Sequence, residues 1–190
     1  MKKQNIALIV VICLVSVVIL SFILYNHWPF IVGKKIVLAT NSVDSFDPFR
    51  GQYMAINYEI SIISGVKEKF SKGDSVFVSL KKDEQGIWRK ENVSKSKPDK
   101  GDFIKGKIID VYENNMIVYK KGKIIDVYEN NIIVVEYGIE QFFFERNANL
   151  PTTNITAEVA ITNSGRARLI QLLHNGKPVK IEYEKFDIKS

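Results

Sequence analysis

The chain has 190 residues, which is enough for one folded domain with its own core and an additional segment. Its formal net charge of +6 comes from 27 basic and 21 acidic residues that are interspersed, so no basic face indicates nucleic-acid binding. The only cysteine, Cys13, lies in an apolar segment, which excludes a disulfide framework and a cysteine-based metal site.

An uncharged apolar run from Ile6 to Tyr25 follows Lys2 and Lys3 at the N-terminus. At a rise of about 1.5 Å per residue, a helix of this length covers ~30 Å, the hydrocarbon thickness of a bilayer. Tyr25 and Trp28 stand where interfacial aromatic residues are expected. Pro29 predicts the end of the helix.

Two interpretations of this segment are open, an uncleaved membrane anchor and a cleaved signal peptide. A signal peptide has a shorter apolar core that ends in a small-x-small site, and ILYNHWPF offers no such site. We therefore expect a transmembrane anchor in residues 1–30, with the lipid bilayer as its partner. Lys2 and Lys3 favour a cytoplasmic N-terminus, which makes this a single-pass cell-membrane protein with residues 31–190 extracytoplasmic.

Residues 31–190 show the pattern of short strands, and none of their longer stretches has helical periodicity. Between Gln52 and Ile60 the side chains alternate, and one face carries Met54, Ile56, Tyr58 and Ile60. Val76, Val78 and Leu80 share a face of a strand before the turn DEQG, and Asn175-Gly176 predicts another turn. Many short strands at regular spacing predict a mainly β fold, an antiparallel β-barrel or sandwich after the N-terminal transmembrane helix.

The chain contains an internal repeat. KGKIIDVYENNMIVYK (105–120) is followed directly by KGKIIDVYENNIIVVE (121–136), and 13 of the 16 positions are identical. Each copy has a strand, an Asn-Asn turn and another strand, so it is long enough for one hairpin. Because a solenoid needs three or more stacked units, we expect residues 105–136 to form an extended hairpin that arose by tandem duplication.

The segment ATNSVDSFDPFRGQYMAINYEIS resembles the motif that names the GDYXXLXY family of membrane-anchored bacterial proteins. Gly51, Tyr53 and Tyr58 match the motif, whereas Gln52 replaces its Asp and Ile56 replaces its Leu. Two further blocks follow in the family's order, YGIEQFFFE (137–145) and AEVAITNSGRARLIQLLHNGKPV (157–179).

The resemblance implies an N-terminally anchored envelope protein, because the members of this family have that organisation and no established biochemical activity. They are often encoded beside polytopic membrane proteins, which implies such a protein as a partner. We expect a non-catalytic interaction module for a neighbouring membrane protein. The alternative is an envelope hydrolase or small-ligand binder that uses the interior of the barrel.

The motif itself supports two interpretations. In the first, it is a structural strand entrance, where Gly51 permits a turn or bulge and Tyr58 extends the apolar face with its hydroxyl on a polar partner. In the second, Arg50, Tyr53 and Glu140 surround a docking edge or a ligand pocket, with Tyr53 on the face opposite Tyr58.

No catalytic constellation is evident, and no metal or cofactor is predicted. His27 lies too close to the bilayer, and His174 belongs to the turn HNGK. No Ser/His/Asp set, paired-His spacing or phosphate-binding glycine loop is present, and nothing singles out one Ser/Lys pair. Since Gln52 stands where the family has Asp, a carboxylate at this position is not an indispensable acid or base.

Overall fold

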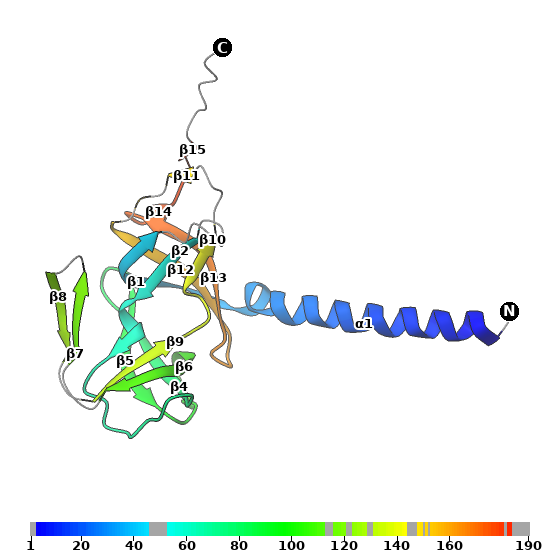
Figure 1. Ribbon diagram of the computed structural model, residues 1–190, viewed down its shortest axis with the longest axis horizontal. Helices are drawn as coiled ribbons and strands as arrows, with labels where there is room; N and C mark the ends of the chain where they lie inside the picture. The colour runs from blue at the N-terminus through cyan, green and yellow to red at the C-terminus, as the bar shows by residue number, and fades with distance from the viewer. Residues whose placement is uncertain are drawn as a thin grey trace, which may run out of the picture.

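The computed structural model describes residues 3–45, 53–112, 116–120, 123–128, 131–143, 148–149, 151, 153–180 and 182–183. A long N-terminal helix, α1 (Lys3–Val32), leads into a domain built almost entirely from strands (Figure 1). The strands are β1 (Lys34–Ser45), β2 (Tyr53–Tyr58), β3 (Ile62–Ile63), β4 (Ser75–Lys82), β5 (Trp88–Ser94), β6 (Asp102–Tyr112), β7 (Met116–Lys120), β8 (Lys123–Tyr128), β9 (Ile132–Glu136), β10 (Gln141–Phe143), β11 (Ala148–Asn149), β12 (Ile155–Ile161), β13 (Ala167–His174), β14 (Lys177–Pro178) and β15 (Glu182–Tyr183). A single 3-10 turn, η1 (Glu59–Ser61), follows β2.

Helix α1 contains one segment long and apolar enough to cross a membrane, the 25 residues Leu8–Val32. The helix extends away from the β domain, so most of its apolar side chains are exposed (Figure 1). The prediction that Pro29 ends the helix is wrong, because Pro29 lies inside α1. The helix ends at Val32, and the N–H of the following Gly33 donates to the Pro29 carbonyl (2.9 Å). The backbone is so close there that a Cβ on residue 33 would clash with this carbonyl.

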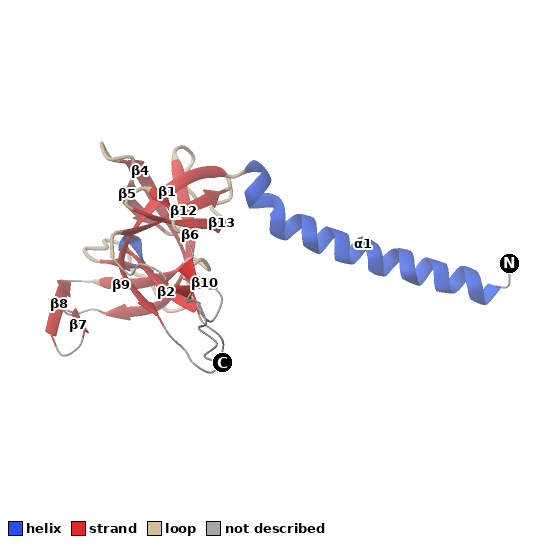
Figure 2. Ribbon diagram, turned by 90° about the horizontal axis from the view of Figure 1, so that it is seen from above, coloured by secondary structure: helices blue, strands red, loops and turns tan. Residues whose placement is uncertain are grey.

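The main sheet has 11 strands in the order β14-β13-β12-β1-β5-β4-β6-β9-β3, and β2 and β10 branch from β1. Strand β1 pairs with β12 over Lys34–Ala39 and with β2 over Thr40–Ser45, so it belongs to both branches. Its neighbours are antiparallel except for a parallel contact with β5. The strands curve around a shared interior (Figure 2), but the sheet is not closed into a barrel. The predicted mainly β fold after one helix is confirmed.

The core follows the alternation of the strands. Met54, Ile56 and Tyr58 are buried in β2, whereas Asn57 between them is exposed. Val76, Val78 and Leu80 are buried in β4 as predicted, and β1, β6, β9 and β12 contribute further apolar side chains to the same cluster. This cluster fills the space between the two branches of the sheet.

The strands of the repeat pair between the two copies and not within each copy. The first half of copy one (β6) pairs with the second half of copy two (β9), while β7 and β8 form a separate two-stranded sheet. The β6–β9 pairing and the β7–β8 pairing have the same register at equivalent positions of the repeat. In each pairing one residue at the same repeat position has no cross-strand partner, Ile109 in β6 and Ile125 in β8. The pairing of β7 with β8 therefore repeats the pairing of β6 with β9. That residues 105–136 form one continuous extended hairpin remains a prediction, because the residues joining the two ladders lie outside the described part.

Candidate functional site

The motif strand β2 lies between two antiparallel neighbours, β1 and β10. Arg50, Gly51 and Gln52 lie outside the described residues. The backbone of Tyr53 begins β2 and pairs with Phe143 of β10, but its side chain is also outside the described part. The expectations for these four side chains therefore remain predictions.

Tyr58 ends the motif strand and is fully buried. Its hydroxyl donates a hydrogen bond to the Ile139 carbonyl (2.7 Å), which satisfies the polar tip of an otherwise apolar side chain. Burial raises the pKa of this phenol well above its ordinary value, and the negative charge of Glu140 raises it further. Tyr58 is therefore a neutral core residue that connects β2 to the segment before β10.

Tyr137 makes the complementary bond from that segment. Its hydroxyl donates to the carbonyl of Ile60 (2.6 Å), and its buried ring lies against Gly106 of β6, where an added Cβ would be 2.9 Å from the ring. Burial also raises the pKa of Tyr137, again with a contribution from Glu140. Sequence reasoning missed this residue, although it begins the block YGIEQFFFE that indicates the family.

Glu140 organises the turn that joins Tyr137 to β10. Its carboxylate accepts the N–H groups of Tyr137 (2.5 Å) and Ile139 (2.9 Å), and its backbone carbonyl accepts the N–H of Ile56 (2.7 Å). Gly138, with a φ of +76°, allows the chain to turn between them. The structure thus brings two of the predicted site residues, Tyr58 and Glu140, to the same turn.

Strand β10 forms one side of this region. It pairs with β2, and the described part of the chain shows no second strand paired with it. Gln141 and Phe143 are exposed on β10, and 66% of Phe143 is accessible. This motif region, defined as β2, β10 and the turn at residues 137–140, combines a rigid buried side with the exposed side chains of β10.

An ion-pair cluster joins η1 to the β4–β5 turn. Arg89 donates to the carboxylates of Asp83 (2.8 Å) and Glu59, and Asp83 also accepts the N–H groups of Gln85 and Ile87. Desolvation acts to raise the pKa of Asp83, but these hydrogen bonds outweigh it and the pKa is lowered. The cluster fixes the position of the loop after Tyr58.

Three observations on the described residues concern candidate catalytic or metal-binding groups. No three His, Cys, Asp or Glu side chains among them are grouped so that they could hold a metal ion. The hydroxyl of Ser61 is buried without a hydrogen-bond partner in the described part, so it lacks the adjacent base that activates a serine nucleophile. His174 is paired with its neighbour Asn175 in the turn after β13 (3.1 Å).

The fold and the motif region define a mainly β protein with one N-terminal apolar helix that is compatible with a membrane anchor. Residues 15–172 match the family model described as GDYXXLXY protein, and the chain belongs to this family. The resemblance noted from the sequence is therefore confirmed. Comparisons with curated proteins and with solved structures give no match.

Proposed function

We propose that this protein is a single-pass, membrane-anchored envelope protein whose β domain binds a neighbouring membrane protein without catalysing a reaction. In this proposal α1 stays in the bilayer as an uncleaved anchor. The lysines before the apolar run favour a cytoplasmic N-terminus, and the β domain then lies outside the membrane.

The observation that carries the interaction role is the exposed side chain of Phe143 on β10, beside the motif strand. Exposed aromatic side chains are enriched at protein interfaces, where they supply apolar contact area. Phe143 supplies exposed apolar surface there, and Tyr53 is its cross-strand neighbour. The bonds from Tyr58 and Tyr137 hold the segment before β10 in place, which reduces the entropy lost on binding.

The geometry supports the alternative, a hydrolase or small-ligand binder with its site inside a barrel, less well. Such a site needs an enclosed hollow with convergent polar groups. The sheet is open, and the buried cluster between its branches consists of apolar side chains and tyrosines whose hydroxyls bond to backbone carbonyls.

Site-specific photocrosslinking in native membranes tests the proposal. A photoreactive residue at position 143 should give one discrete adduct with a membrane protein, and Tyr53→Ala should weaken it while thermal unfolding stays nearly unchanged. The matched control is the same photoreactive residue at Lys90, an exposed position on β5. Equal labelling from both positions, or an adduct unaffected by Tyr53→Ala, would contradict a docking role for β10.

A further inference from the structure

Helix α1 contacts the β domain through a proline-dependent junction. Pro29 has no N–H, so the carbonyl of Tyr25 four residues earlier lacks its usual helical donor. Arg166, which precedes β13, donates a long hydrogen bond to this carbonyl (3.4 Å), and its guanidinium lies 3.8 Å from the centre of the Tyr25 ring. The proline thus creates an attachment point for an arginine of the β domain.

A second arginine strengthens the same junction. Arg168 of β13 donates to the side-chain carbonyl of Asn26 (2.7 Å), and the amide group of Asn26 donates to the Phe22 carbonyl (2.9 Å). The last turns of α1 are therefore bonded to one edge of the β domain.

A groove of about 580 Å³ opens beside this junction. Leu24, Tyr25 and Trp28 of α1 form its apolar wall, and Lys105, Ser164 and Arg166 of the β domain form its polar wall. The Lys105 N–H donates to the carbonyl of Gly165 (2.8 Å), which keeps the two cationic residues side by side. We call this the junction groove.

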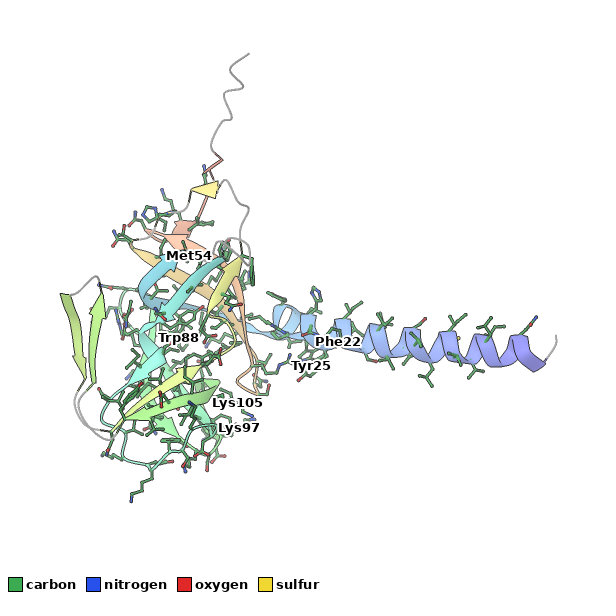
Figure 3. The ribbon with its side chains drawn as sticks, viewed as in Figure 1. Phe22, Tyr25, Met54, Trp88, Lys97 and Lys105 are labelled. Carbon is green, nitrogen blue, oxygen red and sulfur yellow. The ribbon has the colours of Figure 1, made fainter. Side chains whose placement is uncertain are left out.

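The positive charge of the junction groove is not neutralised by the described residues. None of the ion pairs in the described part of the chain includes Lys105, Arg166 or Arg168. Lys97 adds another cation on the same flank of the domain, near Lys105 (Figure 3). An anion would therefore meet uncompensated positive charge here.

The depth of the groove in a bilayer follows from the sequence of α1. The apolar run ends at Tyr25, before the polar residues Asn26 and His27, and Tyr25 and Trp28 are the aromatic residues expected at the membrane–water interface. Arg166 cannot enter the hydrocarbon without a large cost, so the groove lies at the level of the lipid headgroups. Its apolar wall continues along α1 toward the position of the acyl chains.

We propose that the junction groove binds the headgroup of an anionic phospholipid. Lys105 and Arg166 hold the phosphate, and one acyl chain lies along Leu24. This inference rests on the proposed membrane anchoring of α1, and it goes beyond that role because it gives the β domain its own lipid contact. Bound lipid would fix the tilt of the domain on the membrane surface.

Quenching of Trp28 fluorescence by brominated lipids tests the site in the full chain reconstituted into vesicles. Trp28 and Trp88 are the two tryptophans, so Trp88→Phe gives a background in which Trp28 alone reports. Two vesicle preparations of phosphatidylcholine contain the same fraction of either brominated phosphatidylglycerol or brominated phosphatidylcholine. The brominated phosphatidylglycerol should associate with the protein about fivefold more strongly, as expected for a cation at the lipid surface. Lys105→Gln with Arg166→Gln should remove this preference.

The matched control is Lys67→Gln with Lys69→Gln, which should retain the preference. These exposed lysines follow Val66, whose N–H donates to the carbonyl of Asn131 just before β9 (3.4 Å), and neither lysine lines the junction groove. Lys105→Gln alone changes only an exposed side chain, and it should weaken the preference in the same direction.

Three outcomes would overturn the proposal. They are equal quenching by both lipids, a preference that survives the Lys105→Gln/Arg166→Gln pair, and a preference abolished by added inorganic phosphate, which would assign the groove to a soluble anion. Flotation of the vesicles distinguishes the loss of the lipid site from the loss of the membrane anchor. A protein that floats with the vesicles but shows no preference lacks the lipid site only, whereas a protein that does not float lacks the anchor as well.

Discussion

Tyr58 and Tyr137 bond to each other's segments in a reciprocal arrangement. The Tyr58 hydroxyl donates to the carbonyl two residues after Tyr137, and the Tyr137 hydroxyl donates to the carbonyl two residues after Tyr58. One tyrosine belongs to the motif strand and the other to the second block of the family pattern. The two blocks are therefore joined by paired buried bonds, so substitutions in either one affect the other.

Removing either hydroxyl should destabilise the protein. Tyr58→Phe and Tyr137→Phe each leave a buried carbonyl without its donor, at a cost of about 1–3 kcal/mol in the free energy of unfolding. Tyr112→Phe is the control, because the exposed Tyr112 hydroxyl bonds to the Asp110 carboxylate (3.1 Å) and its loss should cost little. Urea unfolding of the full chain in detergent, followed by circular dichroism, measures all three, and equal costs would contradict the reciprocal arrangement.

Stability should fall at alkaline pH because of these two tyrosines. Burial raises both folded-state pKa values, so their contribution is complete below pH 10, the ordinary value for tyrosine. Above that pH the unfolded chain loses protons that the folded chain keeps, and stability falls by about 1.4 kcal/mol per pH unit for each tyrosine. The Tyr58→Phe/Tyr137→Phe variant should show a shallower decline, and an unchanged slope would mean that both phenols ionise in the folded protein.

Deleting one repeat copy should leave a folded domain. Removing residues 105–120 gives the same chain as removing 113–128, because positions 105–112 and 121–128 have identical sequences. The product keeps the complete β6–β9 ladder and loses only the separate β7–β8 sheet. We expect the thermal midpoint of the deletion variant to stay close to that of the parent. A protease-sensitive product would instead show that β7 and β8 support the core.

Gly165 should tolerate a side chain less well than Gly176. Both have positive φ values, +81° and +76°, so alanine brings backbone strain of about 1–3 kcal/mol at either position. At Gly165 a Cβ would also lie 2.8 Å from the Phe103 ring and 2.9 Å from the Lys105 nitrogen, while at Gly176 it meets open space. Gly165→Ala should therefore lower the unfolding free energy more, and equal losses would show that the Gly165 turn can move.

The orientation of the chain can be measured with a reporter fused after Ser190. A cytoplasmic N-terminus and a single span place this fusion on the outer side, so a reporter that matures only outside the cytoplasm should be active. Activity of a cytoplasm-dependent reporter would reverse the orientation. Release of the β domain into the soluble fraction would instead indicate cleavage after a signal sequence.

Sequence patterns predicted the features that depend only on residues close together in the chain. Twenty uncharged residues predicted α1, and the period of two placed Met54, Ile56 and Tyr58 on the buried face of β2. Pro29 misled the prediction because its effect on a helix depends on whether another group satisfies the freed carbonyl, and the distant Arg166 does so. Tyr137 escaped notice for a similar reason, since its partner carbonyl belongs to a remote segment.

The pairing of the repeat could not be derived from the sequence. Because the first eight residues of both copies are identical, pairing within a copy and pairing between copies offer nearly the same side-chain contacts. What separates them is the connection of β6 to β4 and of β9 to β3 in the main sheet, which is a property of the whole fold.

The repeated pairing makes the length of the predicted extended hairpin independent of the core. In such a hairpin each 16-residue unit adds eight residues to each arm, and at ~3.3 Å per residue the tip would move outward by about 26 Å. The strands that meet the rest of the sheet keep the same residues whether the unit is present once or twice. Gain or loss of whole units would therefore change how far the predicted hairpin reaches from the main sheet, while the sheet itself folds from an unchanged set of contacts.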